Sequence, residues 1–294
     1  MAEPVRAGAR ALLRRREAGT IAGLLALCIG LWIATPFFAT VTNLVNVAEQ
    51  SAIIGIIAIG MTFVILTGGI DLSVGSVVAL SGITLAMAVQ GGVPVPLAVG
   101  VGLLTGVLAG ALNGLLVTAG RLPPFIATLG VMSVARGAAL MLSDGRPISG
   151  FPPGLRAIAT ERVLGVPLPV IAMLVLYGLA HLVLTRTVLG RYTYAIGGNE
   201  EATVLAGVNV QRYKILVYAI AGASAAGCAA LLVARLNSAQ PIAGIGYELD
   251  AIAAVVIGGT SLLGGSGSVV GTLVGALIMS VLRNGLNLLG VSSY

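Results

Sequence analysis

Long apolar runs alternate with short polar connections along almost the whole chain. We predict membrane-spanning segments at 20–38, 48–67, 74–90, 93–119, 124–142, 167–185, 213–234, 249–263 and 267–289. Most approach the roughly 20 residues that a helix needs to cross a bilayer, although 249–263 is short for a span. Alternating strands of about ten residues, the mark of a membrane β-barrel, do not occur. The pattern therefore predicts an all-α, polytopic membrane protein of about nine helices.

Composition supports the same fold class. Charged residues make up 9% of the chain, against about 25% in an ordinary soluble domain. Apolar types reach 57%, and the mean hydropathy is +1.06. So few charges could not cover the surface of a soluble fold of this length. We expect residues 1–19 to form a basic N-terminal segment and residues 20–294 a single transmembrane domain.

The positions of the basic residues predict an orientation. Arginines before the first span place the N-terminus in the cytoplasm, because cytoplasmic flanks are enriched in Lys and Arg. Alternation of spans then puts the basic loop 186–214 inside and the loop 143–166 outside. The net charge of +6 follows from this orientation, so nucleic-acid binding is not needed to explain it.

Glycines are too numerous, at 42, to sit in short loops alone. They recur at every fourth residue in two places: Gly102, Gly106, Gly110 and Gly114, and again Gly267, Gly271 and Gly275. Because glycine lets membrane helices approach closely, both series predict tight helix packing.

A short pattern occurs twice. GGIDL at 68–72 and GGTSL at 258–262 each close an apolar run, and each is followed by GSVV, at 75–78 and 267–270. Weak internal repeats with glycine-interrupted apolar segments are typical of transporter folds.

In the first copy, glycine suits the end of one helix, and Asp71 or Ser73 can cap the next. The alternative is that Asp71 faces a solute path or a gate, because ionisable groups at membrane depth are usually functional.

Catalytic motifs are missing. The chain has a single lysine, Lys214, without a phosphate-binding glycine loop before it, and a single histidine, His181. Cys28 and Cys228 fall in apolar runs without metal-ligand spacing. We therefore expect no enzyme activity, cofactor or metal. Any uphill transport draws its energy from a separate subunit.

The loop 186–214 contains one short predicted helix. Asn199 can cap it, Glu200 and Glu201 lie in its first turn, and Gly207 ends it. The pattern alone favours a loop helix without a special function.

The chain resembles the permease subunits of bacterial ABC sugar importers, closest to the ribose permeases. The matching pieces are MTFVILTGGIDLSVGS (61–76), PFIATLGVMSVARG (124–137), GRYTYAIGGNEEATVLAGVNV (190–210), LNSAQPIAGIGYELDAIAAVVIGGTSLLGG (236–265) and GTLVGALIMSVLRNGLNLLGVSSY (271–294). The resemblance covers the chain from about Thr40 onward. Family members usually continue beyond the equivalent of Tyr294 into a tenth helix, so we expect either a truncated sequence or a member that lacks it.

The resemblance implies a homodimer of permease subunits in the bacterial inner membrane, a cytoplasmic ATPase and a periplasmic sugar-binding protein. It also implies that 198–207 is the coupling helix that contacts the ATPase, against the interpretation from pattern alone. The implied coupling residues are Gly198, Asn199, Glu200, Glu201, Ala202, Leu205 and Gly207.

A path for neutral, hydroxyl-rich sugars needs amides and hydroxyls within the spans. The candidates for a pathway or gate are Asn46, Gln50, Asp71, Ser73, Ser280, Asn284 and Asn287. The alternative for each is a hydrogen bond between helices. The working hypothesis is import of a monosaccharide, ribose, by alternating access driven by the ATPase. The rivals are an ion-coupled secondary transporter and an ABC permease for another pentose, a signalling molecule or an amino acid.

Overall fold

Helices make up nearly all of the regular structure in a computed structural model that describes residues 3–291, with side chains from residue 18 onward. Their bounds are α1 Glu3–Ala34, α2 Val41–Leu66, α3 Val74–Gln90, α4 Val95–Thr118, α5 Pro124–Leu142, α6 Pro153–Thr160, α7 Leu168–Arg186, α8 Val188–Gly198, α9 Glu200–Leu205, α10 Val210–Leu236, α11 Tyr247–Ile257 and α12 Val269–Leu288. The side chains of the N-terminal arginines, and Tyr294, lie outside the described residues.

Within the described part of the chain, six helices are long and apolar enough to cross a membrane: α2, α4, α5, α7, α10 and α12. Ala18–Ala34 of α1 and the whole of α3 are shorter apolar helices. The predicted class, an all-α polytopic membrane protein, is confirmed.

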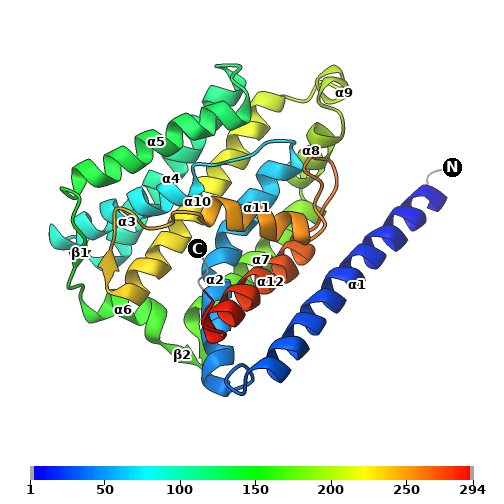
Figure 1. Cartoon of the computed structure of the whole chain (residues 1–294). Coiled ribbons are helices and arrows are strands. Elements are labelled where there is room, and N and C mark those ends of the chain that lie inside the picture. Colours follow the sequence, from blue (N-terminus) through cyan, green and yellow to red (C-terminus); the bar gives the residue numbers. More distant parts are fainter. Residues whose placement is uncertain (1–2, 292–294) are drawn as a thin grey trace.

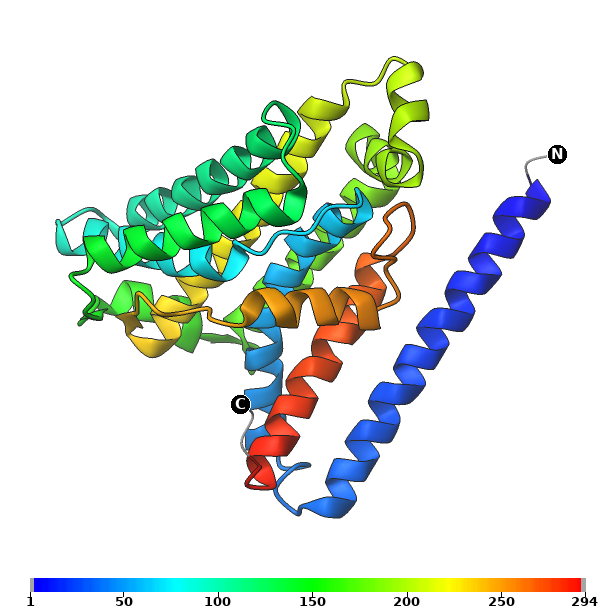
Figure 2. The ribbon, with the colours of Figure 1, turned by 45° about the horizontal axis from the view of Figure 1, so that its top comes forward.

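The segment 249–263 is not a continuous spanning helix, contrary to the prediction. Helix α11 has 11 residues, or about 16 Å, roughly half of a hydrocarbon core. It ends because Gly258 and Gly259 follow, the latter with a positive φ of 90°. The helix runs across α2 and α12 rather than along them (Figures 1 and 2).

Helix α2 lies at the centre of the bundle. Its residues from Ser51 to Leu66 are all buried, and it contacts α7, α10, α11 and α12. Helix α1 stands at the edge and runs beside α12, as both views show (Figures 1 and 2).

Glycines allow α4 and α10 to pack with their backbones in contact. Gly106 and Gly110 of α4 meet the backbone of α10 at Gly222 and Tyr218, so closely that a Cβ at either glycine would overlap it. The predicted tight packing of this series is confirmed. In the second series, Gly271 and Gly275 pack against α11, but Gly267 precedes α12 and belongs to the loop.

Both long loops contain regular structure, of which only α9 was predicted. The loop 143–166 holds α6, β1 (Ile148–Ser149) and β2 (Arg162–Val163). Strand β1 pairs with β4 (Ser238–Ala239) after α10, and β2 pairs with β3 (Val166–Pro167). The loop 186–214 holds α8 and α9, at the opposite end of the bundle from α6 and β2 (Figure 1).

Candidate functional site

The repeated glycine pattern ends two helices with the same geometry. After α2, the N–H groups of Gly68 and Gly69 donate to carbonyls of the last helical turn, and Gly68 has a positive φ of 76°. After α11, the N–H groups of Gly259 and Thr260 make the equivalent bonds. This is the Schellman arrangement that glycine favours. Structurally, Gly68 therefore corresponds to Gly259, one residue away from the sequence match.

The two copies differ where the next helix begins. Ser268 caps α12, and its side chain accepts hydrogen bonds from the N–H groups of Val270 and Gly271. Ser73 stands at the equivalent position before α3, but its side chain accepts no bond from that helix. The predicted Ser73 cap is therefore wrong as a side-chain cap.

Asp71 is buried, with 1% of its surface exposed, and it organises the loop between α2 and α3. Its Oδ1 accepts hydrogen bonds from the N–H of Ser73 (2.8 Å) and the hydroxyl of Ser73 (2.6 Å). The amide of Asn113, on α4, donates to Ser73 Oγ (2.7 Å) and to Asp71 Oδ1 (3.3 Å). Asp71 thus holds the loop before α3 to α4, and it accepts nothing from the N–H groups within α3.

Two other pathway candidates are engaged in packing. Asn284 of α12 and Asn43 of α2 exchange a pair of buried amide hydrogen bonds of 2.8 and 3.0 Å. Ser280 is buried and donates to the carbonyl of Ala276 in its own helix (2.9 Å). In this conformation Asn284 joins α12 to α2, and the hydroxyl of Ser280 is used within its own helix.

The remaining candidates lie at the surface or in a cavity. Gln50 and Asn287 line one cavity of about 450 Å³, together with Arg235 and Arg283. Asn46 is exposed near the start of α2. The structure therefore brings Gln50 and Asn287 to one cavity, which Ser280 and Asn284 do not line.

The predicted helix in the loop 186–214 is present as α9. Asn199 caps it by accepting the N–H of Ala202 (2.8 Å), and Gly207, with a positive φ of 82°, follows it. Glu201 is exposed, and Leu205 exposes 83% of its surface. A solvent-facing leucine beside an acidic first turn suits a surface that another protein covers.

Helix α8 was not predicted. Thr187 begins it by accepting the N–H of Gly190 through its hydroxyl (3.3 Å). Thr187 was a possible N-cap signal in the sequence. The glycines of the segment, which disfavour helix, argued against predicting one there. α8 joins α9 to the core of the bundle.

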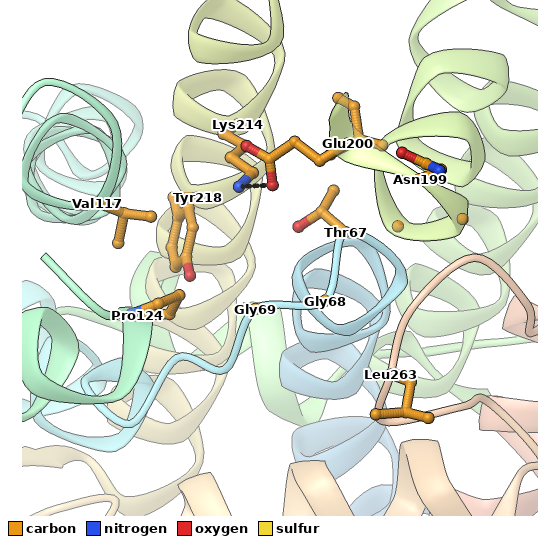
Figure 3. A pocket seen from close by; sticks show the side chains of 13 residues that line it. Thr67, Gly68, Gly69, Val117, Pro124, Asn199, Glu200, Lys214, Tyr218 and Leu263 are labelled. Atoms are coloured by element: carbon orange, nitrogen blue, oxygen red, sulfur yellow. Dashed lines mark hydrogen bonds and ion pairs between the residues drawn. The ribbon is translucent and has the colours of Figure 1, made fainter. Parts of the chain in front are cut away.

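A cavity of about 390 Å³ lies where α8 and α9 meet both glycine breaks. Figure 3 shows Lys214 and Glu200 joined across it by an ion pair of 2.6 Å, with Tyr218 beside Gly69. Its lining comprises Thr67, Gly68, Gly69, Val117, Pro124, Ile196, Gly197, Gly198, Asn199, Glu200, Lys214, Tyr218 and Leu263.

Backbone contacts join these elements into one junction. The N–H of Gly265 donates to the carbonyl of Leu66 (2.9 Å), and the hydroxyl of Tyr194 in α8 donates to the carbonyl of Gly267 (2.9 Å). A Cβ on Gly197 would overlap both Leu66 O and Gly265 N. Any displacement of α8 therefore acts directly on the ends of α2 and α11.

Comparison with known proteins shows the family to which the chain belongs. Residues 43–294 match the family described as branched-chain amino acid transport system / permease component. The chain belongs to this permease family. It is the permease subunit of an ABC importer, a transport component and not an enzyme.

Several relatives are similar over most of their length. Ribose import permease protein RbsC of Bacillus subtilis is 50% identical over 281 residues, which cover 95% of this chain and 87% of the relative. The protein of the same name from Haemophilus influenzae is 49% identical over 263 residues, or 88% and 81%. D-allose transport system permease protein AlsC of Escherichia coli is 39% identical over 263 residues, or 89% and 81%. No solved structure matched the chain.

The family assignment confirms the resemblance and has direct consequences. The protein is a multi-pass protein of the inner membrane, and it works with a separate ATPase and a solute-binding protein. The ion-coupled secondary transporter is thereby disfavoured.

Proposed function

We propose that this permease imports a monosaccharide, ribose, by alternating access driven by the partner ATPase. The supporting observation is identity of about half of all residues to two ribose import permeases across nearly the whole chain. The lower identity to the D-allose permease makes another monosaccharide the runner-up. A second copy of the permease completes the path in this proposal.

The proposed orientation puts the N-terminus, α8 and α9 in the cytoplasm, and α6 with the strand pairs in the periplasm. Helix α10 starts beside α9 and ends at β4, and the loop after α11 returns to Gly197 in α8. Residues 240–257 therefore cross between the two ends of the bundle, part as loop and part as the short helix α11. With this interrupted segment the proposed number of crossings remains nine.

The proposed coupling segment is 198–207, as the resemblance implied. Its exposed face carries Glu201 and Leu205, and α8 links it to both glycine breaks. An ATPase can drive transport only if it binds one conformation of the permease better than the other. The junction around Gly197 supplies the contact through which that preference reaches α2 and α11.

The test uses the complete importer, with ATPase and binding protein, in proteoliposomes loaded with nucleotide. We expect the double variant Glu200→Arg, Glu201→Arg to insert normally but to lose sugar-stimulated ATP hydrolysis and uptake, because opposite charge opposes docking. Glu201→Arg alone leaves the Glu200–Lys214 ion pair intact and isolates the docking effect. Glu161→Arg, on the exposed loop after α6, is the matched control.

Wild-type uptake in the double variant would contradict the docking role. The solute is identified by measuring how unlabelled D-ribose, D-allose and other sugars inhibit uptake of labelled D-ribose. Stronger inhibition of labelled D-ribose uptake by D-allose than by the same excess of unlabelled D-ribose would assign the runner-up.

A further inference from the structure

The helices α3 and α11, each of which follows an irregular segment, begin beside one another. Gly75 lies in the first turn of α3, and Gly244 lies three residues before α11. A Cβ on either glycine would overlap backbone atoms of the other. Two helix N-termini therefore converge on one place inside the bundle. In transporter folds, interrupted helices of this kind commonly form solute sites.

Two charged side chains, Arg136 and Glu248, lie beside this place. Arg136, midway along α5, donates through Nη1 to the carbonyls of Pro241 (2.8 Å) and Ala243 (2.7 Å) and thereby holds the loop before α11. Glu248, in the first turn of α11, accepts the N–H of Gly246 through Oε1 (3.3 Å). The described residues show no ion pair between Arg136 and Glu248.

Both charged side chains line a cavity of about 290 Å³, together with Ser76, Ser133, Met132 and Ile245. Ile245 exposes 67% of its surface, so the cavity is open to the surface of the subunit. Charged groups at membrane depth are costly and mark solute or ion pathways.

Ser76 provides an independent observation. Its side chain is buried, with 2% of its surface exposed, and it lines the cavity. Among the residues that the structure describes, its hydroxyl has no hydrogen-bond partner. The oxygen is not among the fully enclosed unsatisfied atoms, so it keeps access to the cavity and can donate to or accept from water or a ligand there.

The chemistry of the lining selects one class of ligand. Arginine only donates hydrogen bonds, an ionised glutamate only accepts them, and serine does both. Neutral hydroxyl groups on adjacent carbons satisfy all three at once. Ser133 donates to the carbonyl of Leu129 (3.2 Å), so its oxygen remains available as an acceptor. Met132 and Ile245 offer apolar surface to the C–H face of a sugar ring.

We propose that the cavity bounded by Ser76, Arg136 and Glu248 is a subsite that holds the hydroxyl groups of the monosaccharide during its passage. The proposal rests on the proposed function, because it assumes that a monosaccharide is the solute. It adds residues that the sequence analysis did not consider for the pathway. It also links the solute to the coupling segment, since α11 carries Glu248 at one end and leads to the Gly197 junction at the other.

The decisive variant is Ser76→Ala. Its hydroxyl bonds to no described residue, so removing it should leave thermal stability unchanged, whereas a sugar that bonds to it loses one hydrogen bond. We expect uptake of D-ribose to fall by about fivefold, the effect of one net hydrogen bond. Glu248→Gln should reduce uptake further, because the charged acceptor is lost, and Glu161→Gln is the matched acid-to-amide control outside the cavity.

Sugar preference separates a binding role from a structural one. The complete importer is supplied with D-ribose or 2-deoxy-D-ribose, and the same binding protein is present in every sample. A change in the ratio of the two uptake rates must therefore arise in the permease. We expect Ser76→Ala and Glu248→Gln to change this ratio and Glu161→Gln to preserve it.

The outcomes are distinguishable from failure of the proposed function. If the wild-type importer moves no monosaccharide, the proposed function is wrong. If the wild type moves D-ribose, and Ser76→Ala keeps both its rate and its preference, the subsite is wrong. If Glu248→Gln fails to fold, the uptake rate and sugar preference of Ser76→Ala still test the subsite.

Discussion

The two glycine breaks end their helices alike but are held in different ways. The break at 67–73 is buried and polar, with Asp71 bound to Ser73 and Asn113. The break at 258–268 contains no charged residue and exposes 89% of Leu263. It contacts α8 mainly through the backbone of glycines and one tyrosine hydroxyl.

Because the two breaks are held differently, we expect them to have different roles although they share one sequence pattern. Side-chain hydrogen bonds tie the first break to α4 and α5, because Leu72 N–H also donates to Thr128 Oγ1 of α5 (3.1 Å). The second break depends on close packing against Gly197, which changes as soon as α8 moves. Gly197 touches the ends of both helices, but the side-chain bonds of the first break resist displacement, so we expect the second break to move more and to pass movement of α9 into α11.

The largest effect is expected from removing the side-chain bonds of the first break. Asp71→Ala leaves the N–H and hydroxyl of Ser73 and the amide of Asn113 without their buried acceptor, so the free energy of unfolding should fall by about 3 kcal/mol. Ser261→Ala, in the second break, removes only the exposed hydrogen bond that its hydroxyl accepts from the N–H of Leu263 (3.3 Å), and should lower it by less than about 1 kcal/mol. Thermal and denaturant unfolding in detergent measures both, and equal losses would refute the contrast.

A smaller effect on stability, but a specific one on coupling, is expected at the second break. Gly197→Ala places a Cβ against Leu66 O and Gly265 N, and overpacking of this kind costs about 1–3 kcal/mol. Sugar-stimulated ATP hydrolysis should fall, because α8 and α11 are forced apart. Gly178→Ala, in α7 and outside the coupling segment, is the matched control, since a Cβ there meets open space. Equal ATPase activity in both variants would exclude the proposed transmission.

The smallest effect concerns a single hydrogen bond. Tyr194→Phe removes the bond to Gly267 O, worth about 1 kcal/mol, and should speed hydrogen exchange in the loop 258–268 by about fivefold. Tyr192→Phe is the control, because no hydrogen bond of its hydroxyl occurs among the described residues. Mass spectrometry of exchanged peptides compares the two, and unchanged exchange in Tyr194→Phe would show that packing alone holds the loop.

The sequence by itself determined the fold class, most of the helices and the family. Apolar runs of sufficient length, such as the one that forms α2, predict helices because the backbone must bond internally in lipid. Local signals were equally informative. Asn199 marks the start of α9 and Gly207 its end, through contacts within a few residues. Long motifs shared with other permeases identified the family.

Only the tertiary structure decided how the polar residues are used. An asparagine has the same sequence signal whether it pairs with another helix, as Asn284 does with Asn43, or lines a cavity, as Asn287 does. The partners of Asp71 and the convergence of Arg136 with Glu248 likewise join residues far apart in the chain. Such contacts leave no periodicity in the sequence, because they depend on how helices pack against each other rather than on how each helix forms.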